Sequence, residues 1–366
     1  MDEIATPIDR LPDSLLLDIL TYLDLESLFR AANVNHRFYR LTQDKRFWKR
    51  VDCIDLRFLT LSGLKKLIRR PSAIHLTSLR WEGFVRRSPG FQRGSSTRIR
   101  MLHAATPAIL SELAQRCPNL RELHIIYANL DQVTLLDFPA TLEFLGFEGC
   151  VVSFDFFGPL NDPNILPNLR GLDLNYCHNL SSHSRFSIPG ILSREALTVL
   201  QLKHCFKLSC EDLARVPIRL SNLHTLNVSD LSTVDANFIG ILSENARSLK
   251  CLDMSFCQGV DTRSITPLAK SNVCRLEKLY VIETKITDEA LPLLAQYQPQ
   301  LRYLNIVKTG CTADGVASFS RLVDSRCQVE HKCTDVSEKI GASFWWINPK
   351  VNEDVDETQE PAPMEL

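Results

Sequence analysis

The stretch Leu-Arg-Gly-Leu-Asp-Leu at residues 169–174 sets the pattern for most of this 366-residue chain. Apolar residues occupy its first, fourth and sixth positions, and the same hexad returns both upstream and downstream. Clear copies begin at Leu120, Leu142, Leu197, Leu223, Leu249, Leu276 and Leu301, and weaker copies begin at Val51 and Leu76. Most successive copies lie 25–28 residues apart. A period of this length built on such a hexad indicates a repeat architecture.

The hexads predict a fold of the α/β class, a leucine-rich-repeat solenoid with about ten repeats over residues 51–325. The apolar residues of each hexad point inward from a short strand, and the strands form a parallel sheet on the concave wall. Each repeat contacts its neighbours, so the stack is stable although a single repeat is not. Helices are expected on the convex wall at Leu61–Arg69, Pro107–Arg116, Ala236–Asn245, Asp288–Tyr297 and Ala313–Asp324.

Residues between the hexad leucines are expected to form columns on the concave surface. The middle column reads Asp55, Arg80, His124, Gly146, Asp173, Gln201, Asn227, Asp253, Tyr280 and Asn305. The last two repeats present Tyr280, Ile282, Tyr303 and Val307, and a cluster of this kind predicts a patch that binds a client protein. In the alternative, the Phe-Trp-Trp-Ile segment at 344–347 folds back and covers that patch.

An insertion interrupts the array between Leu76 and Leu120. The segment 84–103 carries five arginines and no acidic residue, among Gly, Ser and Pro. Arg86 and Arg87 are candidates for gripping a phosphorylated or acidic client tail, because arginine pairs bidentately with phosphate. The alternative is a solvated loop without a ligand. Residues 326–366 are expected to form a C-terminal cap segment and an acidic disordered tail.

Overall composition excludes several classes of function. Lysine and arginine number 42 against 43 acidic residues, so no charge field suggests a nucleic acid or a membrane surface as partner. The N-terminus lacks the pattern of a signal peptide, and no apolar run is long enough to cross a bilayer. The histidines are scattered and no phosphate-cradling glycine-rich loop is present, so we expect neither catalysis nor a cofactor.

The twelve cysteines are interpreted as structural thiols and not as disulfide partners. Cys150, Cys177, Cys205 and Cys257 each lie three residues after the last apolar residue of a hexad, where the chain turns out of its strand. There is no Cys-x-x-Cys pair and no histidine at zinc spacing, so no metal is expected. Unpaired thiols predict a reducing, intracellular location.

Residues 8–50 do not follow the repeat. Leu15, Leu16, Ile19, Leu20 and Leu23 recur at helical spacing, and two further short amphipathic segments follow. Three short helices with so many apolar residues have too little core of their own, so this unit is expected to bind a partner. The alternative is a helical cap over the open end of the solenoid.

The same residues resemble the F-box. The likeness runs through Leu11-Pro12-Asp13, the helix up to Leu23, the later Ala31, Val34, Arg37 and Phe38, and the closing Phe47-Trp48. Asn35 stands where the family often has cysteine, and Phe38 where it usually has tryptophan. The resemblance implies contact with a Skp-family adaptor through Leu11, Pro12, Leu15, Ile19, Leu20, Leu23, Leu28, Val34, Phe38 and Trp48.

An F-box joined to leucine-rich repeats resembles the F-box/LRR class of substrate receptors. That resemblance implies a non-catalytic subunit of an SCF-type ubiquitin ligase, linked through the adaptor to cullin and RING subunits. The repeats would hold a protein substrate for ubiquitination and proteasomal degradation in the cytoplasm, the nucleus or both. The alternative is a leucine-rich-repeat scaffold or inhibitor that binds a partner without ubiquitin transfer.

Overall fold

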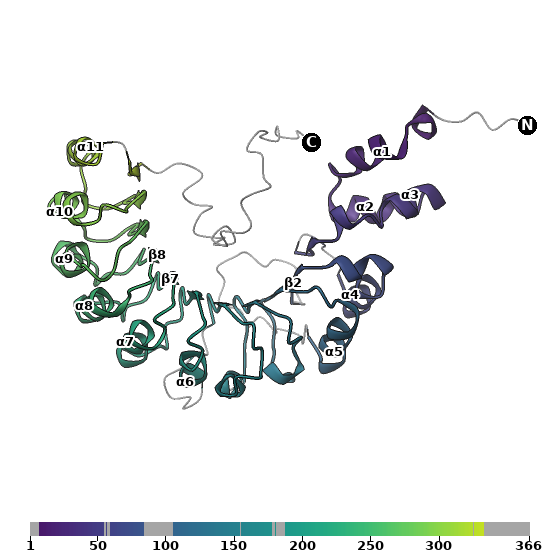
Figure 1. The fold of residues 1–366 in the computed structure, drawn as a ribbon, viewed down its shortest axis with the longest axis horizontal. Coiled ribbons are helices and arrows are strands. Elements are labelled where there is room, and N and C mark those ends of the chain that lie inside the picture. The colour runs from purple at the N-terminus through teal and green to yellow at the C-terminus, as the bar shows by residue number, and fades with distance from the viewer. Residues whose placement is uncertain are drawn as a thin grey trace, which may run out of the picture.

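The fold is described from a computed structural model of the chain. The structure describes residues 7–54, 56, 59–83, 105–153, 155–177, 180, 187–324 and 326–332. Within these ranges the chain forms an open arc, with strands along the inner wall and helices along the outer wall (Figure 1). A group of short N-terminal helices lies at one end of the arc, beyond α4.

The inner wall is one parallel sheet of eleven strands in chain order, which confirms the predicted solenoid. Each strand pairs with the next at the same hexad register, so equivalent residues of successive repeats lie side by side. The strands are β1 Arg50–Asp52, β2 Ser78–Glu82, β3 Glu122–Ile126, β4 Phe144–Gly146, β5 Gly171–Asp173, β6 Val199–Gln201, β7 Thr225–Asn227, β8 Cys251–Asp253, β9 Lys278–Tyr280, β10 Tyr303–Asn305 and β11 Gln328–Glu330.

Helices or short 3₁₀ turns occupy the outer wall of most repeats. The helices are α4 Leu61–Ile68, α5 Pro107–Arg116, α6 Ser187–Leu192, α7 Cys210–Arg219, α8 Ala236–Asn245, α9 Thr262–Ala269, α10 Ala290–Tyr297 and α11 Ala313–Leu322. The 3₁₀ turns are η3 Pro71–His75, η4 Leu135–Asp137 and η5 Gly158–Asn161. Side-chain oxygens cap several of these helices, as where Asp235 accepts from the amide of Phe238 before α8. The five helices expected from the periodicity all form.

The N-terminal unit contains η1 Pro7–Arg10, α1 Asp13–Leu20, α2 Leu25–Ala31, α3 His36–Leu41 and η2 Lys45–Phe47. Asp24 and Asn35 begin the second and third helices, because their side chains accept hydrogen bonds from the amides of Ser27 and Phe38 at 2.7 and 2.9 Å.

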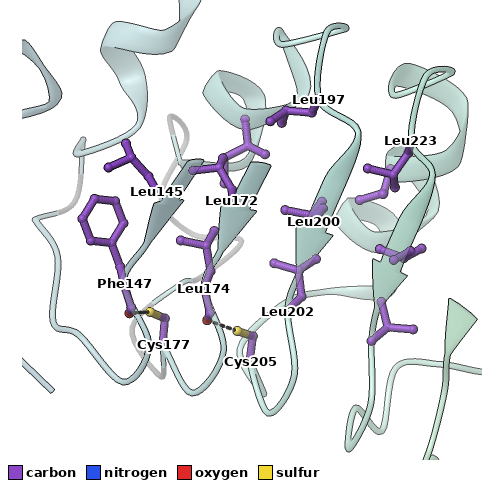
Figure 2. Packing of buried hydrophobic residues seen from close by; sticks show 14 of the residues in the cluster. Leu145, Phe147, Leu172, Leu174, Cys177, Leu197, Leu200, Leu202, Cys205 and Leu223 are labelled. Carbon is purple, nitrogen blue, oxygen red and sulfur yellow. Dashed lines mark hydrogen bonds between the residues drawn. The ribbon is translucent and has the colours of Figure 1, made fainter. Parts of the chain in front are cut away.

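The hexad residues form one continuous core between the sheet and the outer wall (Figure 2). Leu172, Leu200 and Leu226 sit in register on adjacent strands and are at most 1% exposed. Fully burying each such leucine contributes about 1.5–3 kcal/mol before the entropy of folding is counted. Repetition of this layer holds the arc together.

The predicted cysteine positions form a ladder of buried thiols along the core. Cys177 and Cys205 donate to the carbonyl oxygens of Phe147 and Leu174 in the preceding repeats, at 2.9 and 3.1 Å (Figure 2). Cys150 and Cys257 make the same bond to the preceding repeat. Burial raises the pKa of these thiols, so they stay protonated and serve as donors. Every cysteine in the described part of the chain is free, as predicted.

A left-handed residue precedes the cysteine position in eight repeats and turns the chain out of its strand. The residues with positive φ there are Tyr127, Gly149, Tyr176, His204, Asp230, Phe256, Glu283 and Lys308. Only Gly149 adopts this conformation without a steric cost, so the other seven are held in place by the tertiary structure.

Two ends of the array differ from the sequence prediction. Val51 pairs with Leu79, so the first hexad is Trp48, Val51 and Cys53, and the expected hexad starting at Val51 is shifted by three residues. Asp52, and not Asp55, therefore stands beside Arg80 in the middle column. At the other end, β11 adds an eleventh strand that the prediction of about ten repeats missed. Its hexad carries Arg326 at the position of the first leucine, which hides it from a search for apolar residues.

Candidate docking surfaces

The three N-terminal helices share a small core of their own. Leu16, Leu20, Leu28, Phe38 and Leu41 make up this cluster, and each is at most 9% exposed. Ion pairs between Asp13 and the guanidinium groups of Arg37 and Arg40 join α1 to α3, at 2.8 and 2.5 Å. The helices are therefore held in one arrangement before any partner binds.

Trp48 joins this unit to the solenoid. The indole is fully buried, and its Nε1 donates to the carbonyl oxygen of Thr42 at 2.6 Å. The Phe29 ring lies 5.9 Å from it, and the Arg70 guanidinium covers both rings at 4.7 and 5.1 Å from their centres. Trp48 also fills the first hexad position, so the helical unit continues the repeat core directly.

Four of the ten predicted adaptor contacts lie inside the protein. Leu20, Leu28 and Trp48 are at most 3% exposed, and Phe38 is 9% exposed. Their side chains build the core of the unit, so they cannot form its outer surface. The prediction was wrong for these four residues because motif position alone does not separate the two faces of a short helix.

The other predicted contacts are open to solvent or partly so. Leu15 is 49% exposed, Ile19 47%, Leu23 38% and Val34 66%, while Pro12 is exposed and Leu11 half-buried. Leu15, Ile19 and Leu23 recur every four residues, on the side of the helix next to the buried Leu16 and Leu20.

Tyr22 belongs to the same surface and was not among the predicted contacts. It is 87% exposed, and its amide donates to the carbonyl oxygen of Ile19 at 3.2 Å, which continues the helical path beyond α1. Its spacing of three residues from Ile19 was the signal that could have identified it. We define the docking face as Pro12, Leu15, Ile19, Tyr22, Leu23 and Val34.

The concave wall is the second candidate surface. Strand register confirms that the residues of the predicted middle column from Arg80 to Asn305 lie side by side. Their predicted exposure is wrong for several of them, since His124, Gln201, Asn227, Asp253 and Asn305 are at most 7% exposed. Arg80 is paired with Asp52 at 3.3 Å and with Glu148 at 3.8 Å. Asn175 links its repeat to the next, donating to Gln201 and accepting from the amide of Lys203. This part of the wall is a charged and hydrogen-bonding surface, not an apolar groove.

Titratable groups on this wall are shifted by burial. Burial, together with the neighbouring Glu148 carboxylate, raises the pKa of Asp173 to about 7. Burial also raises the pKa of Glu148 and of Asp253. The His124 ring is stacked on Phe144 and buried, which lowers its pKa to about 3 and keeps it neutral.

The predicted apolar patch on the last repeats is largely closed. Tyr280 is 8% exposed and Val307 2%, so these two are corrected from surface to buried residues. The Tyr280 ring packs 5.0 Å from that of Tyr303, which crowds the column between β9 and β10. Tyr303 and Ile282 remain half-buried. The predicted sites at Arg86 and Arg87, and the covering segment at 344–347, lie outside the described residues.

No group of three or more potential metal ligands occurs among the described residues. No helix in the same part of the chain has both the length and the apolar character to cross a membrane.

Comparison with known proteins supports the reading of both parts. The F-box-like family model matches residues 8–54. Human F-box/LRR-repeat protein 12 is 33% identical over 165 residues, which are 45% of this chain and 47% of that relative. This alignment thus spans about half the length of the human protein. The bovine protein of the same name is 26% identical over 304 residues, covering 82% of this chain and 88% of its own length.

Among solved structures, an internalin from Listeria monocytogenes matches 84% of this chain and 94% of its own. The identity is 14% and the TM-score 0.40, a likeness too loose to support an argument. Residues 8–54 thus match the F-box-like family, and the chain, with its repeat sheet behind the helical unit, is similar over most of its length to a protein named F-box/LRR-repeat protein 12.

Proposed function

We propose that this protein is the substrate-recognition subunit of an SCF-type ubiquitin ligase. In this proposal the docking face binds a Skp-family adaptor, and the repeats hold a client protein. The observation that carries the proposal is a set of large apolar side chains held exposed on a rigid helical unit. Water-exposed leucine, isoleucine and tyrosine at helical spacing on a well-packed base favour association with a partner protein.

The energetics of the docking face suit a stable complex. Covering the exposed halves of Leu15 and Ile19 contributes about 0.8–1.5 kcal/mol each, and the ring of Tyr22 adds further apolar area. Because the Asp13 ion pairs and the caps at Asp24 and Asn35 already fix the helices, little conformational entropy is lost on binding.

The proposed mechanism is positioning, with no chemical step in this chain. The adaptor links the F-box to cullin and RING subunits, and these bring a charged ubiquitin-conjugating enzyme close to the client. Holding the client in the arc raises the effective concentration of its lysines at that enzyme. Because Trp48 belongs to the repeat core and Phe47 packs against both that core and the core of the helical unit, the two binding surfaces are held together by packed side chains. The proposal places the protein in the cytoplasm or nucleus, where free thiols persist.

Affinity capture from cells tests this assembly. Tagged wild-type chain is expected to bring down the adaptor, cullin and RING subunits together. Leu15→Ser/Ile19→Ser should lose all three at once, because the adaptor is their only link to the chain.

The matched control is Leu136→Ser/Leu322→Ser, which alters two apolar residues that are 64% and 59% exposed elsewhere on the surface. The control should retain all three subunits. A wild-type chain that captures none of them while remaining folded would leave a repeat scaffold or inhibitor as the function.

A further inference from the structure

A basic cleft lies at the seam between the helical unit and the first repeats. It has a volume of about 250 Å³ and is lined by Lys45, Lys49, His75, Thr77, Asn119 and Arg121. Lys45 comes from η2 and Lys49 from the residue before β1, while His75 ends η3. Three separately folded pieces of the chain therefore contribute to one small site.

The cleft carries positive charge that no described carboxylate neutralises. None of the six lining residues is acidic. Lys45, Lys49 and His75 form no ion pair with any residue in the part of the chain that the structure describes. Arg121 reaches Glu143 at 3.5 Å, and both side chains remain over 40% exposed, so this pair is weak.

The equivalent position in a later repeat shows the contrast. Lys49 and Lys250 both occupy the second position of a hexad. Lys250 is neutralised by Glu277 of the next repeat at 2.9 Å, whereas the residue beside Lys49 in the next repeat is Thr77. Lys49 thus lacks the carboxylate partner that Lys250 has in the next repeat.

The backbone beneath the cleft is rigid. The amide of Thr77 donates to Lys49 and the amide of Arg121 donates to Thr77, each at 2.8 Å, so these three residues lie on neighbouring strand entries about 4.8 Å apart. The Asn119 side chain donates to the carbonyl oxygen of Ile74 at 2.8 Å and fixes the adjoining turn. The flexible lysine and arginine side chains therefore project from a fixed backbone that also carries the Thr77 hydroxyl and the Asn119 amide.

We propose that this cleft binds a phosphate monoester. The two lysines, together with an arginine that is weakly paired with Glu143, attract a phosphate dianion, whose oxygens can accept bonds from all three side chains and from the Asn119 amide. The volume of about 250 Å³ is large enough for one phosphate group with its waters. Since the site joins η2 to the first three repeats, the bound anion stabilises the seam of the folded protein.

Calorimetric titration of the full chain with inorganic phosphate, at constant ionic strength set with chloride, tests the site. One phosphate per chain is expected, with a rise in melting temperature that saturates with the binding curve. Lys45→Gln/Lys49→Gln should weaken phosphate binding at least tenfold and abolish most of the thermal shift. The control Lys250→Gln should bind as the wild type does.

Equal binding by wild type and Lys45→Gln/Lys49→Gln, or no binding by the wild type, would overturn the proposal. The same titration with a short phosphoserine peptide, and with the same peptide carrying serine, shows whether the natural ligand is a phosphorylated protein or a small phosphate ester. Tighter binding of the phosphopeptide than of free phosphate, with none of the serine peptide, identifies a phosphorylated protein segment as ligand. Equal affinity for phosphopeptide and free phosphate identifies a small phosphate ester. Both results support the site.

Discussion

At the scale of the residue, exposure separates the roles of side chains that the sequence makes look alike. Leu15 and Leu16 are neighbours of the same type, yet the first is 49% exposed and the second 1%. Leu16 packs in the small helical core, whereas Leu15 faces outward. Substitutions at the two kinds of position should therefore affect different measurements, stability in one case and partner binding in the other.

Trp48→Ala should lower the free energy of unfolding by about 3–5 kcal/mol, because it empties a fully buried site and removes the bond to Thr42. Urea denaturation measures this loss. Val34→Ala, at a 66% exposed position, serves as the control and should change stability by under about 0.5 kcal/mol. Comparable losses for the two variants would show that Trp48 does not join the helical unit to the repeats.

Asp173 should make the protein less stable as the pH rises from about 4 to 7. Its folded-state pKa of about 7 lies above the ordinary value of 3.8, so in this range the folded protein retains a proton that the unfolded chain has lost. Each pKa unit by which the folded-state value exceeds the ordinary value corresponds to about 1.4 kcal/mol of folding free energy.

Asp173→Asn should flatten this part of the pH–stability curve and raise stability at neutral pH, since the amide stays neutral and can still accept from the Asn175 amide. Thermal melts of the wild type and the variant at a series of pH values measure this change in slope. An unchanged slope in the variant would mean that Asp173 is charged in the folded protein.

The sequence predicted the residues whose role follows from position in the repeat. The thiols of Cys177 and Cys205 were expected to be buried and free, because the turn after each strand leaves room for a small donor. Trp48 was assigned to the wrong side, since its place in the repeat register becomes visible only when Val51 is seen beside Leu79. Burial by neighbouring columns, as for Tyr280 and Val307, likewise depends on strand spacing that a single sequence does not contain.

At the scale of the element, each repeat fits its neighbour through side chains that cross between strands. Gly146 on β4 lies beside His124 on β3, and a Cβ at Gly146 would lie 2.2 Å from the His124 Nδ1. The imidazole is held by stacking on Phe144, so it cannot move away freely. The absence of a side chain at Gly146 thus allows β3 and β4 to pair at the normal distance.

Gly146→Ala should destabilise the protein by about 1–3 kcal/mol through this overlap, as measured by chemical denaturation. Gly240 on α8 has no atom within 4 Å of its would-be Cβ, and Gly240→Ala should instead stabilise by about 0.5–1 kcal/mol. A neutral Gly146→Ala would contradict the packing of β3 against β4.

Elements with strong periodicity were predicted well, and those with weak signals were not. The expected helices near α4, α5, α8, α10 and α11 formed with similar bounds. Helices α7 and α9 were missed, and each contains a proline, at Pro217 and Pro267. Proline disfavours a helix locally, but packing against neighbouring helices overrides that preference.

At the scale of the whole molecule, the protein presents two surfaces of different chemistry. The helical unit that carries the apolar docking face lies at one end of the arc (Figure 1), whereas the concave wall is polar and charged over its central repeats. The period of the hexads was enough to predict the arc. The orientation of the helical unit was not predictable, since it depends on contacts among Phe29, Trp48 and Arg70 that no repeat pattern encodes.

Calorimetry with the two purified proteins measures whether the exposed apolar face of the helical unit binds a Skp-family adaptor. We expect an equimolar complex for the wild type, about 10- to 100-fold weaker binding for Leu15→Ser/Ile19→Ser, and unchanged binding for Leu136→Ser/Leu322→Ser. A folded wild-type chain that does not bind the adaptor, or a Leu15→Ser/Ile19→Ser chain that binds as tightly as the wild type, would contradict this expectation.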